Sequence, residues 1–187
     1  LHRSGHSFPT RRSSDLAFQE VVHNQSYSYV LSTLVDQGEQ EKIFDYWKHD
    51  EVLKERNNFI TDGYQAFADD PSVDSFLKSI VYDVVLEGLF FYAGFAFFYN
   101  LASNQKMVST STMINYINRD EQIHVSLFGH IFNETLHENP ALDHDYYRTF
   151  VTDTFKQAAD LEIKWARNLI GKDRKSTRLN SSHLLIS

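Results

Sequence analysis

The sequence predicts an all-α protein, a bundle of about five or six long helices. Apolar residues recur at spacings of three and four along most of the chain, which is the period of an amphipathic helix. Only 3 prolines and 7 glycines occur in 187 residues, so few positions interrupt regular structure. No segment joins alternating apolar and polar residues to a hairpin turn, as paired strands require.

The first two predicted helices precede residue 70. One spans residues 17–36, with an apolar inner face and with Gly38 as its C-terminal stop. The next spans residues 40–68, where Gly63 is a candidate break. Its many charged residues predict that this helix lies on the outside of the bundle.

Three further helices are predicted after residue 70. Asp70 followed by Pro71 is typical of a helix start, an N-cap acid with proline at the first helical position, and this helix runs to about residue 100. The last two helices cover residues 106–138 and 143–170. The residues expected to end them are Pro140 and Gly171.

Residues 80–102 form an apolar run that is long enough to raise the question of a membrane span. The run contains Asp83 and Glu87, and ionisable side chains at membrane depth are costly and rare. We therefore predict a buried central helix and no membrane association. An acid kept inside such a helix indicates a function, because an unpaired buried carboxylate is strongly disfavoured.

Composition narrows the chemistry of the chain. The net charge of -7 provides no polycationic surface for a nucleic acid, so we expect no nucleic-acid partner. The absence of cysteine excludes disulfides, zinc–thiolate sites, iron–sulfur clusters and thiol nucleophiles. Histidine, aspartate and glutamate remain as metal ligands, and the composition suits a reducing cytoplasm.

The two ends of the chain have an unusual composition. Residues 1–16 and 173–187 are rich in Arg, Ser and His and lack apolar periodicity, which is typical of disordered tails. One short sequencing-adaptor string can encode residues 173–176, and its opposite strand in a shifted frame encodes residues 12–16. We therefore expect non-native tails at 1–16 and 173–187 around a helical domain, residues 17–172, that is incomplete at both ends. The alternative is two polar tails that share codons by chance.

Two Glu-x-x-His pairs carry the predicted chemistry. Glu20 with His23, and Glu121 with His124, each place a carboxylate and an imidazole one turn apart on one helix face. A single such pair is common on solvated helices, but two pairs and Glu87 on a third helix form most of a two-metal site in a helical bundle. Oxygen and nitrogen ligands without thiolate suit iron or manganese. The histidines expected to have no such role are His49, His130, His137 and His144.

Tyr27 lies on the same helical stripe as Glu20 and His23, four residues after the histidine. It is either a core tyrosine with a paired hydroxyl or, beside an oxygen-activating metal pair, the side chain most readily oxidised to a radical. A dry pocket would protect such a radical. The side chains on the facing helices that suit its walls are Phe91, Phe95 and Ile117.

The segments Glu20–Tyr27, Leu86–Tyr92 and Arg119–His124 resemble the small, radical-generating subunit of class I ribonucleotide reductase, a ferritin-like dimetal-carboxylate family. The resemblance covers residues 17–171. It implies one metal on Glu20 and His23 and a second on Glu87 and His124. It also implies that Glu121 and Glu20 bridge the two metals.

The resemblance implies further roles and partners. Tyr27 matches the radical tyrosine, and Asp120 matches the acid that hydrogen-bonds His23 on the electron path. The expected partners are a large catalytic subunit and a second copy of the chain, in the cytoplasm. The expected activity is the reduction of ribonucleoside diphosphates to deoxyribonucleotides.

The sequence also departs from the family. The sixth metal ligand of the family is an aspartate on a preceding helix, and nothing before residue 17 supplies it. The tryptophan of the electron path and the C-terminal docking tail are missing too, so we expect this fragment alone to be inactive. Asp83, one turn before Glu87, is an alternative ligand but is expected to lie behind the ligands or at the surface. The alternatives are another ferritin-like dimetal oxidase, of the desaturase or hydroxylase type, and a ferritin-like iron-binding protein without catalysis.

Overall fold

A computed structural model describes the backbone of residues 8–183 and the side chains of residues 15–171. Within this part the chain is helical throughout its regular elements and contains no strand, which confirms the predicted all-α class. The elements are α1 (Phe8–Leu34), α2 (Gln37–His49), α3 (Glu51–Asp69), α4 (Val73–Val85), the π-helical turn η1 (Leu86–Phe90), α5 (Phe91–Ser103), α6 (Val108–Glu138) and α7 (His144–His183).

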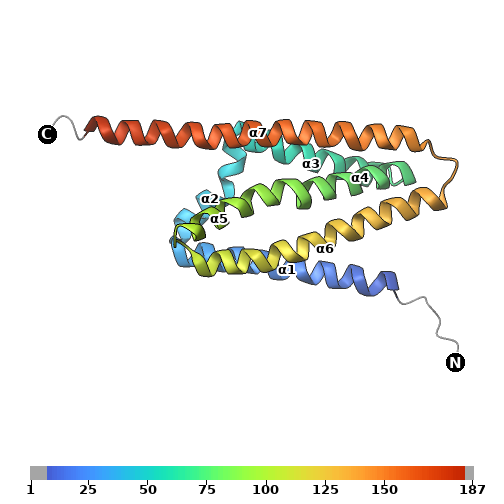
Figure 1. Ribbon diagram of the computed structural model, residues 1–187, viewed down its shortest axis with the longest axis horizontal. Coiled ribbons are helices and arrows are strands. Elements are labelled where there is room, and N and C mark those ends of the chain that lie inside the picture. Colours follow the sequence, from blue (N-terminus) through green and yellow to red (C-terminus); the bar gives the residue numbers. More distant parts are fainter. Residues whose placement is uncertain (1–7, 184–187) are drawn as a thin grey trace, which may run out of the picture.

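The central element is the continuous rod formed by α4, η1 and α5 (Figure 1). Helices α3 and α7 pack on one side of this rod, and α6 packs along the other. Helix α1 contacts α6 at the outer edge of the bundle, opposite α7. The rod therefore holds Glu87 between the two halves of the molecule.

Two buried apolar clusters lie along the rod in the described part of the chain. The first joins Ile60 of α3, Val85 and Phe90 of the rod, and Ala158 of α7. The second joins Phe95 of the rod to Ile114 and Ile117 of α6. By length and composition, Val73–Ser103 is apolar enough to cross a membrane, and both clusters use it as a core element. Its central position agrees with the prediction, but Tyr92 and Phe97 of α5 are exposed, so the helix is buried only in part.

The structure has the predicted break between the first two helices, but Gly38 is not the residue that ends the first helix. Gly38 lies inside α2, and the Asp36 carboxylate caps that helix by accepting a hydrogen bond from the Glu39 amide at 3.0 Å. The stretch 40–68 is not one helix either. It is divided at Asp50, whose carboxylate accepts from the Leu53 amide at 3.0 Å and so starts α3.

Other predicted boundaries also shift. Ser72, not Asp70, is the N-cap of α4, in a reciprocal capping box with Ser75. Helix α7 continues past Gly171, so this glycine does not end the helix as predicted. Because α1 and α7 extend across 8–16 and 173–183, these residues are helical rather than irregular. Whether they are native stays a prediction.

Helix α3 is part of the core, contrary to the prediction that it lies outside. Ile60 and Gly63 are both buried against the neighbouring helices. A Cβ added at Gly63 would overlap the ring of Tyr82 on α4. Glycine is therefore required here by the close approach of two helices and does not break α3.

We expect Gly63→Ala to lower the free energy of unfolding by about 1–3 kcal/mol, because the added methyl group overpacks the α3–α4 contact. The matched control is Gly94→Ala in α5, where an added Cβ meets no atom within 4 Å. That change should stabilise the helix by about 0.5–1 kcal/mol. Urea unfolding of both variants checks the pair, and equal effects of the two would contradict this packing.

Helix α1 presents its polar side to the bundle, contrary to the predicted apolar inner face. His23 is buried, whereas Phe18 is 68% exposed and Tyr29 is 71% exposed. The other large hydrophobic residues of α1 that are exposed are Val21, Val22, Tyr27 and Leu34. Among the described residues, α1 therefore contacts the bundle mainly through the face that carries the predicted metal ligands.

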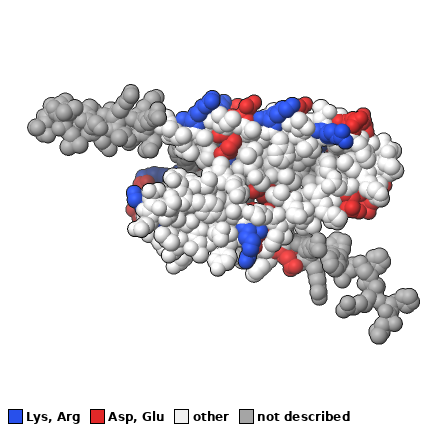
Figure 2. Space-filling view, viewed as in Figure 1, with Lys and Arg blue, Asp and Glu red and all other residues white. Residues whose placement is uncertain are grey.

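Charged side chains are unevenly distributed on the face drawn in Figure 2. Along the α7 edge, Lys and Arg alternate with Asp and Glu, and much of the rest of this face is uncharged. The cations on this face do not gather into a basic patch. An even mixture of both signs favours solubility over the binding of one highly charged partner.

Candidate metal centre

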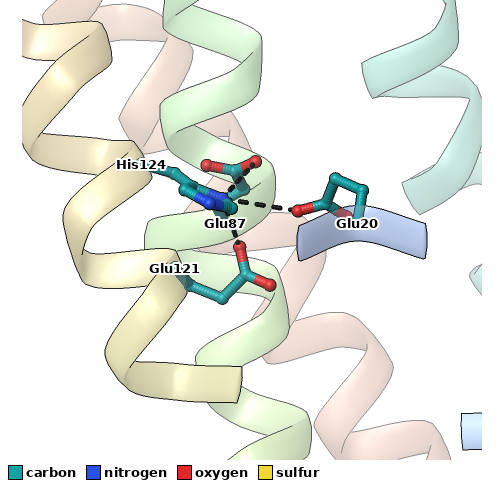
Figure 3. A group of neighbouring side chains, drawn as sticks. All are labelled: Glu20, Glu87, Glu121 and His124. Atoms are coloured by element: carbon teal, nitrogen blue, oxygen red, sulfur yellow. Dashed lines mark ion pairs between the residues drawn. The ribbon is translucent and has the colours of Figure 1, made fainter. Parts of the chain in front are cut away.

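Three elements bring the predicted ligands together (Figure 3). Ligand atoms of Glu20 from α1, Glu87 from η1, and Glu121 and His124 from α6 all lie within 4.8 Å of one another. Glu121 and His124 are only 2% and 1% exposed. Four of the five predicted ligands thus converge, and the fifth, His23, lies beside them with its Nδ1 3.1 Å from Glu121 Oε1. Their binding of metal remains to be tested.

The π-helical turn η1 carries Glu87 at the centre of the rod. Such turns insert an extra residue into a helix and occur frequently at functional sites. Gly88 lets α6 come close, because a Cβ there would lie 3.3 Å from Val125. The carbonyl of Phe90, at the end of the turn, accepts a hydrogen bond from Arg56 Nη2 at 2.8 Å. Arg56, which belongs to α3, also pairs with Glu162 of α7. The turn is therefore held by α3, and α7 in turn holds the Arg56 side chain.

Both histidines direct Nδ1 into the carboxylate cluster. His23 Nδ1 lies 3.1 Å from Glu121 Oε1, and His124 Nδ1 lies 3.3 Å from Glu121 Oε2. Glu20 Oε1 lies 3.5 Å and 3.4 Å from the same two nitrogens. Glu87 Oε1 is 3.6 Å from His124 Nδ1. Glu121 and Glu20 thus occupy the positions between the histidines that bridging ligands would take.

Unsatisfied atoms test whether this cluster fits a metal pair. Five of its buried atoms have no hydrogen-bond partner among the described residues: Glu20 Oε1, His23 Nδ1, Glu87 Oε2, Glu121 Oε2 and His124 Nδ1. Leaving buried polar atoms unpaired is costly in a folded protein. Carboxylate oxygens and imidazole nitrogens that converge in this way suit divalent iron or manganese, so the residues fit a dimetal centre.

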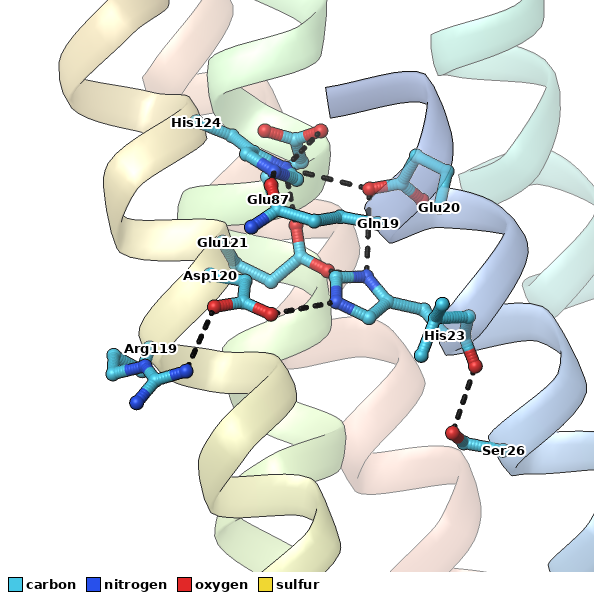
Figure 4. A network of polar contacts seen from close by, with 10 residues as sticks. Gln19, Glu20, His23, Ser26, Glu87, Arg119, Asp120, Glu121 and His124 are labelled. Carbon is cyan, nitrogen blue, oxygen red and sulfur yellow. Dashed lines mark hydrogen bonds and ion pairs between the residues drawn. The ribbon is translucent and has the colours of Figure 1, made fainter. Parts of the chain in front are cut away.

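The outer nitrogens of the two histidines have different partners (Figure 4). His23 Nε2 lies 3.3 Å from Asp120 Oδ2, and Arg119 Nη2 lies 3.4 Å from the other carboxylate oxygen. His124 Nε2 lies 2.8 Å from Gln19 Oε1. An acceptor at Nε2 favours the tautomer that leaves the Nδ1 lone pair free for a metal.

The electrostatics of the cluster favour bound protons when no metal is present. Burial raises the pKa of Glu87 to about 7. Burial and the charge of Glu121 raise the pKa of Glu20. For His124, burial lowers the pKa, but the nearby carboxylates of Glu121 and Glu87 outweigh burial and raise it to about 10. A metal must displace these protons when it binds.

We expect the apparent affinity for Mn²⁺ to rise with pH. Because the pKa of His124 is about 10, metal binding releases its proton throughout the range from pH 6 to pH 8. Glu87, with a pKa of about 7, releases a second proton only in the lower half of this range. The rise should therefore be steeper below about pH 7 than above it. Isothermal titration calorimetry in buffers of different ionisation enthalpy counts the protons, and a pH-independent affinity would contradict this assignment.

Tyr27 lies beside the cluster but is 38% exposed. Burial is nonetheless the largest cause that raises the pKa of its phenol, followed by the charges of Glu121 and Glu20. Phe95 and Ile117 belong to one buried cluster with Phe91 packed against it, so the three predicted pocket walls lie together. The described residues do not close a dry pocket around the Tyr27 ring.

The remaining predicted residues lie away from the ligand cluster. Asp83 accepts a hydrogen bond from the Tyr64 hydroxyl and is outside the group of converging ligand atoms. Burial raises the pKa of Asp83. Each of the four histidines expected to have no metal role is exposed: His49, His130, His137 and His144.

Sequence reasoning missed Gln19 and Tyr64. Gln19 comes immediately before Glu20 and four residues before His23, so its spacing alone places it on the ligand face of α1. That spacing was an available signal. The bond between Tyr64 and Asp83 joins α3 to α4, and no local spacing predicts a contact between residues that far apart in the chain.

The helical bundle and its carboxylate–histidine cluster define a ferritin-like protein. Over residues 13–184 the chain matches the family model described as "Ribonucleotide reductase, small chain". The chain therefore belongs to the ribonucleotide reductase small-chain family. The match crosses the boundaries at residues 16 and 172, where the sequence predicts non-native tails, and the origin of those ends stays a prediction.

Individual relatives agree with the family. The chain is 68% identical over 158 residues to the ribonucleoside-diphosphate reductase subunit beta of Halalkalibacterium halodurans, covering 84% of the chain and 46% of the relative. It is 44% identical to the subunit beta of Treponema pallidum, covering 83% of the chain and 44% of that relative. The chain thus spans about half the length of the curated relatives that it matches.

A solved structure agrees as well. The ribonucleotide reductase R2 subunit from Clostridium botulinum matches with a TM-score of 0.78 and 40% sequence identity, covering 83% of this chain and 49% of that one. A structure from Bacillus halodurans, assigned to class I ribonucleotide reductase, matches with a TM-score of 0.85 and 64% identity, covering 89% and 60%. The agreement supports the helix arrangement described above.

Proposed function

We propose that this chain is part of the small subunit of a class I ribonucleotide reductase, which stores a radical on Tyr27 and passes it to a separate large subunit. The large subunit then reduces ribonucleoside diphosphates to deoxyribonucleotides. The observation that carries the proposal is the position of Glu121, whose two oxygens face the inner nitrogens of His23 and His124 at 3.1 and 3.3 Å. A carboxylate placed between two imidazoles suits a pair of metals held close together.

The proposed centre holds two iron or two manganese ions. His124 and Glu87 would hold one metal, because Glu87 lies near His124 Nδ1. His23 would hold the other together with Glu20, which lies near the inner nitrogens of both histidines. A reduced metal pair bound there would supply the oxidising power, drawn from oxygen, for the loss of one electron and one proton from the Tyr27 phenol. The chain contributes the ligands, their orientation and the surroundings of the phenol.

Two groups of residues act on either side of the metal ligands. Asp120 accepts the outer hydrogen of His23 and holds this imidazole in place, which suits a relay of electrons and protons toward the large subunit. On the other side, Tyr27 lies close enough to Glu121 and Glu20 for their charges to raise the pKa of its phenol. Phe91, Phe95 and Ile117 are proposed to keep water from the radical.

The proposed partners follow from the family. They are the large catalytic subunit and a second copy of this chain, with no nucleic acid and no membrane, in the cytoplasm. The substrate chemistry belongs to the large subunit because this chain has no cysteine to form a thiyl radical. The whole polypeptide that carries this chain would be needed for activity.

Reconstitution with a large subunit tests the proposal. The whole polypeptide, loaded with iron or manganese, should produce deoxyribonucleotides only when the large subunit is present. Oxidation of another substrate without that subunit would instead support a desaturase or hydroxylase. Mineral loading far beyond two metals per chain would support iron storage.

A further inference from the structure

We propose that Gln19 is a positioning residue for His124 and that it makes the two metal positions inequivalent. The inference rests on the proposed dimetal centre. It concerns a residue of α1 that acts through the histidine of α6 and does not itself reach the ligand cluster. The feature that carries it is the bond of 2.8 Å between His124 Nε2 and Gln19 Oε1.

The bond fixes which nitrogen of His124 carries hydrogen. Gln19 Oε1 can only accept, so Nε2 must be the donor, and the lone pair of a neutral His124 is then at Nδ1. His124 Nδ1 is buried, has no hydrogen-bond partner among the described residues, and faces Glu20, Glu87 and Glu121. Gln19 therefore directs the ligating lone pair of His124 into the cluster.

The two histidines receive different kinds of outer acceptor. His23 donates to the Asp120 carboxylate, which is negatively charged, whereas His124 donates to the neutral amide of Gln19. A charged acceptor increases the basicity of a metal-bound imidazole more than a neutral acceptor does. Removal or charging of the Gln19 acceptor should therefore change metal affinity at the His124 position and leave the His23 position nearly unchanged.

The surroundings of Gln19 decide which substitution is informative. Gln19 and His124 both line a surface cavity of about 790 Å³ between α1 and α6. A shortened side chain at position 19 would admit water from this cavity, and water can replace the amide as acceptor. Leucine has nearly the size of glutamine and accepts no hydrogen bond, so Gln19→Leu removes the acceptor and keeps water away.

Mn²⁺ titration of the whole polypeptide that carries this chain tests the inference, with free Mn²⁺ followed by electron paramagnetic resonance. The wild type should bind two equivalents. Gln19→Leu should weaken one of them by about 10- to 100-fold and leave the other unchanged. Gln19→Ala should weaken this Mn²⁺ equivalent less than Gln19→Leu does, because a water molecule can replace the amide as the acceptor.

Two further variants separate positioning from packing. Gln19→Glu restores an acceptor and should return the weakened equivalent to wild-type affinity or tighter, which a purely structural role would not produce. Gln25→Leu makes the same substitution at an exposed position of α1 and should change neither equivalent.

Several results would overturn the inference. Two unchanged affinities in both Gln19→Leu and Gln19→Ala would contradict it, as would equal weakening of both equivalents or no recovery in Gln19→Glu. If Gln19→Leu fails to fold, Gln19→Ala and Gln19→Glu still give the comparison. If the wild type bound no Mn²⁺, the proposed function would be overturned too. If the Gln19 variants bound both Mn²⁺ equivalents with wild-type affinity, only this inference would be overturned.

Discussion

Tyr27→Phe is expected to abolish nucleotide reduction and to leave metal binding intact. The substitution removes the phenol oxygen of Tyr27. The proposed radical forms when this phenol loses one electron and one proton, so phenylalanine cannot form it. None of the converging ligand atoms belongs to Tyr27, so two Mn²⁺ equivalents should still bind. Deoxyribonucleotide formation with the large subunit should fall by on the order of a thousandfold or more, as is typical when a reacting group is removed.

The matched control is Tyr29→Phe, which makes the same change on the same helix at a residue that is 71% exposed. Its nucleotide reduction should equal that of the wild type. Retained activity in Tyr27→Phe, or equal loss in both variants, would show that Tyr27 is not the radical site.

Glu121→Gln is expected to weaken both metal equivalents. One Glu121 oxygen faces His23 and the other faces His124, so neither proposed metal position keeps its bridging carboxylate. Each equivalent should lose on the order of a hundredfold or more in affinity, since even the outer partners of metal ligands contribute about 10- to 100-fold. Mn²⁺ titration measures both losses directly.

Glu134→Gln provides the control for Glu121→Gln. Glu134 lies on the same helix, α6, and is exposed. Its replacement should change neither equivalent. If Glu121→Gln weakened one equivalent alone, Glu121 would be a terminal ligand of a single metal and not a bridge.

The ligand cluster could be predicted from the sequence because helix periodicity is local. Spacing of three residues places Glu20 beside His23 and Glu121 beside His124 on any helix, whatever the rest of the fold does. Glu87 could be predicted in a similar way, because an acidic residue inside an apolar run indicates a buried carboxylate with a function. These short-range rules also predicted the central rod.

Contacts between helices could not be predicted by such rules. The bond from His124 to Gln19 joins residues 105 positions apart, so it depends on how α1 and α6 pack. The same holds for Gly63, which the sequence suggested as a helix break. In the structure a glycine is needed at this position because the Tyr82 ring of the neighbouring helix leaves no room for a Cβ atom. At the π-helical turn that carries Glu87, the Phe90 carbonyl accepts a hydrogen bond from Arg56 of another helix, which is again a contact between distant parts of the chain.

The orientation of α1 shows where apolar periodicity fails. The apolar face of this helix was expected to be its inner face, yet Phe18, Val21 and Leu34 are exposed, and His23 faces inward. Periodicity shows that a helix has two faces but does not say which one a particular neighbour covers. Here α6 offers buried carboxylate and imidazole groups, and the polar face of α1 complements them.

Electron paramagnetic resonance of the whole, metal-loaded polypeptide tests the central claim most directly. After exposure to oxygen, the wild type should give a tyrosyl radical signal, and Tyr27→Phe, with the same metal content, should give none. A wild type that binds two metals and forms no tyrosyl signal, or a signal that persists in Tyr27→Phe, would contradict the account.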